Sequence, residues 1–159
     1  MLVAPCGDGA LVRAMLMRGV DAMGVDKATS FTRESERLTP GRVQTTKFGN
    51  ARDAAALPFP DGAFECVVCV HGLEDLPEEQ IDHAMREFAR ITRRSIFIVV
   101  EAGNGVAGRE WWEERLFTHG LRRHPLMQRV THFTALGNES GHMCLVMEKC
   151  PGSGTPGFA

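Results

Sequence analysis

The stretch LVAPCGDGALV, residues 2–12, decides the fold of this chain. Its apolar first residues are typical of a strand, and an amphipathic pattern typical of a helix begins after the glycine-rich turn. In open parallel sheets, ligands bind beyond the carboxyl ends of the strands, at the turn that leads into the first helix. Gly7 and Gly9 carry no side chain, so backbone N–H groups of this turn can approach a ligand closely. The stretch therefore predicts a strand, a ligand-binding turn and a helix.

Apolar runs and amphipathic stretches alternate along the rest of the chain. Residues 64–73 and 95–101 are nearly continuous apolar runs, which is typical of parallel strands covered on both faces. Residues 76–94 predict a helix between them, with one face buried. The residues expected on that face are Ile81, Ala84, Met85, Phe88 and Ile91. Two late strands, near 128–135 and 142–149, are expected to pair antiparallel, and the whole pattern predicts an α/β fold with a mostly parallel sheet and a late antiparallel strand.

The composition is that of one soluble globular domain. Of the 159 residues, 43% are hydrophobic and 24% charged, and a net charge of −2 gives no broad basic surface for nucleic acid or an anionic membrane. No apolar run approaches about 18 residues and no secretion signal opens the sequence, so we expect a cytoplasmic protein. The five cysteines, an odd number, indicate reduced thiols. We expect one domain over residues 1–150 and a flexible tail, rich in glycine and proline, over residues 151–159.

Cys66 and Cys69 form a C-x-x-C pair, a spacing that zinc and redox sites use. The pair lies in an expected strand, where residues three positions apart point to opposite faces. The sequence offers no second pair at metal-ligand spacing. We therefore interpret both cysteines as small core residues and expect no metal site.

Asp26 ends the expected second strand, 19 residues after Gly7. A carboxylate at this place in a parallel sheet accepts hydrogen bonds from both ribose hydroxyls of an adenosine, whereas the alternative interpretation makes Asp26 a turn residue. The dinucleotide fingerprint requires a third glycine where Val12 stands, which disfavours NAD and FAD. The phosphate-binding pattern G-x-x-x-x-G-K-[ST] is also absent from the sequence, so ATP and GTP are unsupported.

Four stretches together resemble the class I S-adenosylmethionine-dependent methyltransferases, and among them the type 11-like members. CGDGALVRAMLMRGVDAMGVD, residues 6–26, is similar to the first motif and second strand of the family, and DAAALPFPDGAFECVV, residues 53–68, to the segment that enters its fourth strand. VHGLEDLPEEQIDHAMREFARITR, residues 70–93, and IFIVVE, residues 96–101, are similar to the following helix and the fifth strand. The resemblance covers nearly the whole chain. It implies a Rossmann-like, doubly wound sheet and S-adenosylmethionine as cofactor, with S-adenosylhomocysteine as product.

The resemblance also implies which residues contact the cofactor. Gly7 and Gly9 are expected against its methionine part and ribose, and Asp26 on the ribose hydroxyls. Asp53 is expected on the adenine amino group, with the Ala54 backbone at the ring edge, although a helix N-cap is an equal alternative for Asp53. The residues that the resemblance assigns to the cofactor are Cys6, Gly7, Gly9, Asp26, Lys27, Asp53, Ala54, Cys69 and Val70.

His71 is the candidate catalytic base. Methyl transfer needs a nucleophile held in line with the methyl carbon and a group that removes the proton of the acceptor where it has one. His71 follows the expected fourth strand, and histidine changes charge near neutral pH, while a polar cap on the core is the alternative. Glu74 and Asp75 are either substrate contacts or the start of the next helix, and Glu101 is a weaker candidate at the end of the fifth strand.

Two further groups of residues are candidates for contacts with a substrate or partner. Trp111 and Trp112 are adjacent in an expected helix, so we expect one in the core and the other at the surface. A basic group late in the chain either binds an anionic partner or forms a solvated face. That group is Arg122, Arg123, His124 and Arg129. His119, His124, His132 and His142 show no ligand spacing and are expected at the surface or in loops.

Three departures from the family pattern leave two functions open. Val3 stands where the family has an acidic residue, Pro5 where it has its first glycine, and the helices that usually cover the cofactor from the N-terminal side are lacking from this sequence. The first function is methyl transfer to a small-molecule acceptor, because the sequence has no tyrosine and no Asn-Pro-Pro-Tyr type of motif for nucleic-acid bases. The second is a degenerate methyltransferase fold that acts as a non-catalytic partner subunit. In either case we expect a homodimer or a partner chain over the uncovered site.

Overall fold

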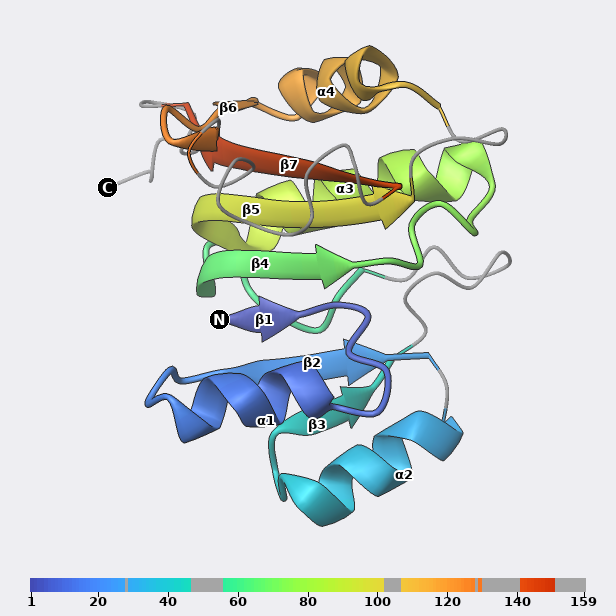
Figure 1. Cartoon of the computed structure of the whole chain (residues 1–159), viewed down its shortest axis with the longest axis vertical. Helices are drawn as coiled ribbons and strands as arrows, with labels where there is room; N and C mark the ends of the chain where they lie inside the picture. The colour runs from blue at the N-terminus through green and yellow to red at the C-terminus, as the bar shows by residue number, and fades with distance from the viewer. Residues whose placement is uncertain (28, 47–55, 102–106, 128, 130–140, 151–159) are drawn as a thin grey trace.

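The structure, a computed structural model, describes residues 1–27, 29–46, 56–101, 107–127, 129 and 141–150. Its strands are β1 (Leu2–Val3), β2 (Met23–Asp26), β3 (Val43–Thr45), β4 (Phe64–Val70), β5 (Thr92–Glu101), β6 (Leu121–Arg123) and β7 (His142–Lys149). In this part of the chain they form one sheet of seven strands, in the order β3-β2-β1-β4-β5-β7-β6 (Figure 1). The pairs among β1 to β5 are parallel, and β7 runs antiparallel to both of its neighbours. The expected mostly parallel sheet with a late antiparallel strand is therefore confirmed.

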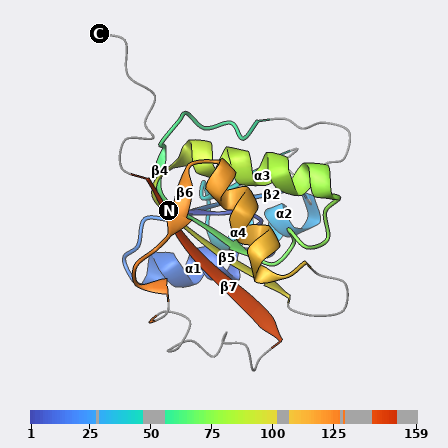
Figure 2. The ribbon, with the colours of Figure 1, turned by 90° about the horizontal axis from the view of Figure 1, so that it is seen from above.

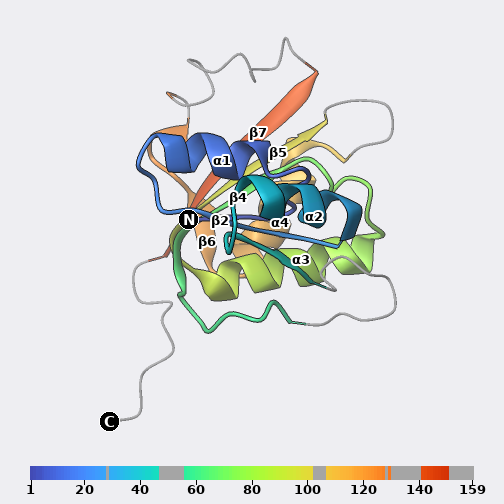
Figure 3. The same ribbon diagram turned by 90° about the horizontal axis from the view of Figure 1, so that it is seen from below.

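Helices cover both faces of this sheet. They are α1 (Ala10–Met17), α2 (Thr29–Leu38), α3 (Glu78–Ile91) and α4 (Arg109–Thr118). α1 lies on one face, whereas α3 and α4 lie on the other (Figures 2 and 3). The five residues expected on the buried face of α3 are all in the core that the helix forms with the sheet. β4 and the second half of β5 have buried residues on both faces, so their apolar residues, such as Val67 and Val68 or Val99 and Val100, follow one another directly.

β1 is short but central. It pairs with β2 on one side and with β4 on the other. Beyond the strand, the N–H of Ala4 donates to the carbonyl of Val68 and the N–H of Cys6 donates to the carbonyl of Val25, both at 2.9 Å. The turn after β1 is therefore fixed to both neighbouring strands, at the edge of the sheet where ligands bind in parallel folds.

The helix expected over residues 76–94 is shorter in the structure, and the prediction was wrong for residues 92–94. α3 ends at Ile91, because Thr92 takes an extended backbone conformation with ψ 142° and begins β5 directly. Arg93 and Arg94 therefore lie in β5, where their guanidinium groups are 3.0 and 3.8 Å from the carboxylate of Glu65 in β4. Helical periodicity alone predicted the end of α3 three residues too late, because it does not show that residues 92–94 belong to β5, which pairs with β4.

Other expectations concern the end of the chain. The expected strand at 142–149 is confirmed as β7, and its antiparallel neighbours in the described part are β5 and β6, both of which precede residues 128–135. Apart from Arg129, residues 128–135 lie outside the described residues, as does the expected tail, 151–159. No helix in the described ranges is long and apolar enough to cross a membrane.

An ion pair between the buried Glu87 and the partly exposed Arg90 holds the segment before β4 against α3. The side chain of Glu87 is 6% exposed and accepts hydrogen bonds from Nε and Nη2 of Arg90, both at 2.8 Å. Glu87 also accepts the N–H of Leu57 at 2.7 Å. Arg90 in turn donates to the carbonyl oxygens of Leu57 and Phe59, at 3.0 and 2.8 Å. One guanidinium group therefore satisfies a buried carboxylate and holds the incoming segment against the helix.

Removal of this guanidinium should destabilise the fold, because the buried carboxylate of Glu87 loses its counter-charge. We expect Arg90→Ala to lower the free energy of unfolding by about 3 kcal/mol in urea denaturation. Arg86→Ala is the matched control, because Arg86 is exposed on the same helix and lies 3.5 Å from Asp82. Its effect should stay within about 0.5 kcal/mol. Equal losses in the two variants would contradict the structural role of Arg90.

The same pair makes stability depend on pH. Burial alone would raise the pKa of Glu87, but hydrogen bonds from Arg90 and the Leu57 N–H, with the charge of Arg90, outweigh burial and hold that pKa below its usual value. Such a carboxyl stabilises the fold above its pKa in the unfolded chain, about 4.3, and this contribution is lost as the pH falls through the folded value. The free energy of unfolding should therefore decrease between about pH 5 and pH 3, and less so in Glu87→Gln. An unchanged pH slope in Glu87→Gln would exclude this contribution.

Candidate functional site

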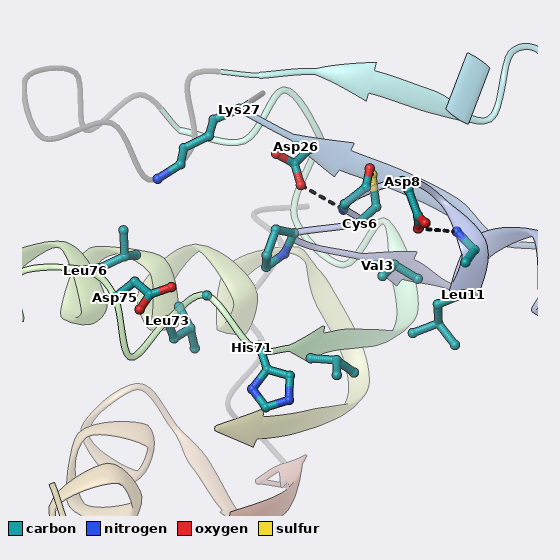
Figure 4. A pocket seen from close by; sticks show the side chains of 15 residues that line it. Val3, Cys6, Asp8, Leu11, Asp26, Lys27, His71, Leu73, Asp75 and Leu76 are labelled. Atoms are coloured by element: carbon teal, nitrogen blue, oxygen red, sulfur yellow. Dashed lines mark hydrogen bonds between the residues drawn. The ribbon is translucent and has the colours of Figure 1, made fainter. Parts of the chain in front are cut away.

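A cleft of about 520 Å³ opens at the carboxyl end of the central strands. Its walls come from the turn after β1, the end of β2 and the segment after β4 (Figure 4). The residues expected at the site that line it are Cys6, Gly7, Asp26, Lys27, Val70 and His71. Gly9 and Cys69 lie outside its lining, and Asp53 and Ala54 lie outside the described residues. The structure thus brings together the first-turn, second-strand and fourth-strand candidates.

The turn after β1 is held from two sides. The N–H of Gly7 donates to Oδ2 of Asp26 at 2.8 Å (Figure 4), and the hydroxyl of Ser35 in α2 donates to the carbonyl of Gly7 at 3.2 Å. Gly9 has a left-handed backbone with φ 78°, and a Cβ there would lie 2.6 Å from Oγ of Ser35. The absence of a side chain at Gly9 therefore lets Ser35 of α2 pack closely against the turn, whereas Gly7 lines the cleft.

Pro5 fits into the turn because the facing residue is glycine. A Cβ on Gly72 would lie 3.0 Å from Cγ of Pro5, and Gly72 has a left-handed φ of 92°. Both residues line the cleft, so their contact joins the turn after β1 to the segment after β4. The sequence reasoning missed Gly72, for which the available signal was the His-Gly pair directly after an apolar run.

Carboxylates dominate the charged side chains of the cleft. Asp8, Asp26 and Asp75 line it together with one lysine, Lys27. Asp26 is buried, with 7% of its surface exposed, whereas Asp75 is exposed. The cleft therefore suits a ligand with positive charge better than a polyanion.

The thiols near the cleft are not nucleophiles at neutral pH. Burial and the charge of Asp26 raise the pKa of Cys6 to about 12. Burial and the charge of Glu74 also raise the pKa of Cys69. Because the thiolate is the reactive form, both groups act by packing. Within the described ranges, no group of three or more histidine, cysteine, aspartate or glutamate residues is arranged to hold a metal ion.

His71 stands on the wall of the cleft opposite Asp26 (Figure 4). Its ring contacts two residues that the sequence did not assign to it, Glu74 and His142. Glu74 is buried beside His71 rather than exposed at the start of α3, and His142 is the first residue of β7. Glu101 has an exposed side chain and contributes its backbone N–H to Glu74.

The remaining candidates lie away from the cleft lining. Trp112 is buried at 1% exposure, as expected for one of the two tryptophans, and Trp111 is half-buried with the guanidinium of Arg115 3.5 Å from its ring centroid. Arg122 pairs with Glu148 at 2.6 Å, so part of the late basic group is neutralised by the protein itself. This pairing favours a solvated face over an anion-binding site.

A profile of the methyltransferase-domain family matches residues 2–95, more than half of the chain. The chain belongs to this family. A comparison with curated protein sequences finds no match.

Solved structures share the fold at low sequence identity. A TehB-like SAM-dependent methyltransferase from Corynebacterium glutamicum superposes with a TM-score of 0.73 and 18% identity, over 94% of this chain and 79% of that chain. Magnesium protoporphyrin IX methyltransferase from Synechocystis PCC 6803, solved with bound SAM, gives a TM-score of 0.69 and 16% identity, over 94% of this chain and 68% of that chain. For the complex between the Haloferax volcanii Trm112 methyltransferase activator and a methyltransferase, the values are 0.68 and 14%, over 94% and 80% of the two chains. The Rossmann-like fold is confirmed, and the family together with structures holding SAM and SAH supports S-adenosylmethionine as cofactor.

The packing of Gly9 against Ser35 gives a test of the turn. We expect Gly9→Ala to lower the free energy of unfolding by at least about 1 kcal/mol more than Gly62→Ala, measured by urea denaturation. Gly62 is the matched control, because it also has a positive φ, 62°, but nothing lies within 4 Å of its Cβ position. Equal losses in the two variants would show that the backbone conformation, and not the approach of α2, accounts for the cost.

Proposed function

We propose that the cleft binds S-adenosylmethionine and that the chain transfers the methyl group to a small-molecule acceptor. The observation that carries the proposal is the meeting of a glycine turn, a buried carboxylate and a histidine around one cleft. The volume of about 520 Å³ lies within the usual range of small-molecule sites. Its place at the carboxyl edge of a parallel sheet is where such folds bind nucleotide-like ligands.

The lining fits an adenosyl ligand with a positively charged sulfur. Nothing lies within 4 Å of the Cβ position of Gly7, so the turn presents open space beside Asp26. The Gly7 N–H fixes the carboxylate of Asp26, which we assign to the ribose hydroxyls. Asp8 and Asp75 add negative charge that favours a cationic ligand. We further assign Asp53 and Ala54 to the adenine, as the family resemblance implies.

When bound, the cofactor would supply a methyl group on a positively charged sulfur; the acceptor would take that methyl group, and S-adenosylhomocysteine would be left. The chain contributes position, because the acceptor must approach in line at about 3 Å. Val70 and His71 line the cleft at the end of β4, where we place the acceptor. His71 is our proposed base for the proton that an acceptor loses.

The charge of the cleft and of the chain supports a small-molecule acceptor over nucleic acid. Three lining carboxylates and a net charge of −2 oppose a polyanion. The five cysteines are all free thiols, which agrees with a reducing compartment such as the cytoplasm.

A second candidate is a subunit that acts with a partner chain. Pro5 favours it, because proline supplies no N–H to a ligand in the turn. One of the similar structures is a complex of a methyltransferase with the activator Trm112, which supports a partner chain as the second candidate. We expect either a homodimer or a partner chain to cover the cleft, which sedimentation of the purified chain tests.

Titration with S-adenosylhomocysteine in a calorimeter tests the leading proposal. We expect saturable binding to the unmodified chain, and about 10- to 100-fold weaker binding by Asp26→Ala, because hydrogen bonds to a charged group contribute about 1.5–3 kcal/mol. Asp21→Ala is the matched control, since Asp21 is an exposed aspartate at the other end of β2.

The outcomes separate the two candidates. Unchanged affinity in Asp26→Ala would remove Asp26 from the site. Absence of binding at millimolar ligand would reject the chain as a free-standing methyltransferase, and binding that appears only with a partner would favour the subunit. Melting curves without ligand verify that each variant folds. The increase in stability on adding ligand is a second measure of binding, because ligand at 100 times its dissociation constant adds about 2.7 kcal/mol.

A further inference from the structure

His71 is held at the rim of the cleft by its backbone. Its φ of 62° is left-handed, a conformation that residues other than glycine seldom adopt. Its N–H donates to the carbonyl of Val99 in β5 at 2.8 Å. The residue is thus fixed to the ends of two adjacent strands, β4 and β5, and its side chain starts from a defined position.

Glu74 fixes the ring of His71 through a buried carboxylate. The side chain of Glu74 is 7% exposed, and its Oε1 lies 2.8 Å from Nδ1 of His71. The same oxygen accepts the N–H of Glu101 at 3.1 Å. Oε2 is buried and has no hydrogen-bond partner among the described residues. A carboxylate oxygen accepts hydrogen bonds, so a hydrogen bond across the 2.8 Å contact has Nδ1–H as its donor.

The ring of His142 limits the same imidazole from another element. The two ring centroids are 5.0 Å apart and their planes make an angle of 62°. His142 is in register with Glu101 in the pairing of β7 with β5, which brings it to the rim. The ring of His71 therefore lies between contacts with Glu74 and His142, and rotation about its side-chain bonds is restricted.

With Nδ1 engaged by Glu74, Nε2 is the nitrogen that remains for a ligand. We infer that Glu74 is a positioning residue that holds His71 in the Nδ1–H form, so that Nε2 serves as an unprotonated base in the cleft. This inference rests on the proposed function and narrows the acceptor class. The acceptor carries a removable proton on its attacking atom, as a hydroxyl does. That proton passes to Nε2 as the new bond to the methyl carbon forms, and the resulting imidazolium lies beside the Glu74 carboxylate.

The tautomer of His71 can be measured without a substrate. Long-range ¹H–¹⁵N correlation spectra distinguish the Nδ1–H, Nε2–H and doubly protonated forms of each histidine, and the signals missing from His71→Gln identify His71. We expect the unmodified chain, at a pH where the ring is neutral, to show the Nδ1–H form. Glu74→Met keeps the length of the side chain but removes the acceptor, so His71 should change to a majority of the Nε2–H form. Glu74→Gln retains an oxygen acceptor and should restore the Nδ1–H form.

Controls make each outcome decisive. Glu79→Met changes an exposed glutamate in the first turn of α3 and should leave the His71 signals unchanged. An Nε2–H ring in the unmodified chain, or an Nδ1–H ring that persists in Glu74→Met, would overturn the inference. If Glu74→Met does not fold, the spectrum of the unmodified chain alone decides between the two tautomers. Failure of S-adenosylhomocysteine to bind would reject the proposed function but leave the tautomer result intact, so the two failures are distinguishable.

Discussion

The hydrogen bond from the Gly7 N–H to the Asp26 carboxylate is the interaction on which the cleft depends. It joins the turn after β1 to the last residue of β2, and the Cys6 N–H strengthens the junction by donating to Val25 of the same strand. With β4 paired on the other side of β1, three strand ends meet at one edge of the sheet. The cleft exists because a two-residue strand is held by backbone hydrogen bonds that continue past its end.

The sequence alone predicted the parts of the fold that follow from burial. β4 and the second half of β5 are buried on both faces, so their residues there are apolar without alternation. α3 has one buried face, so its apolar residues recur every three or four positions. Burial does not reveal where a helix passes directly into a strand. Arg93 and Arg94 suit the end of a helix by charge, yet pairing with β4 places them in β5 beside Glu65. The burial of Glu87 was likewise not predictable. The segment that contacts it, at Leu57, lies 30 residues away in the sequence, and helical spacing does not indicate such a contact.

Prediction of the site shows the same division. Gly7 and His71 follow recognisable strands and Asp26 ends one, so chain order and parallel topology were sufficient to bring them to one edge. The contact of Pro5 with Gly72 and that of His71 with His142 are different, because they arise from side-chain packing between segments far apart in the sequence. Glu74 was considered by position, but its hydrogen bond with the N–H at the end of β5 is one that no local pattern indicates.

β7 runs against the other long strands, so it places its first residue, and not its last, beside His71, which lines the cleft. The turn after β1 and the end of β2 come from the first 27 residues, whereas His142 comes from near the end of the chain. A substitution of His142 can therefore alter the surroundings of His71 while the register of β1 and β2 stays unchanged. Because the two parts of the site come from different ends of the chain, substitutions in the late part can change which compounds the protein accepts while the turn after β1 and the end of β2 are kept.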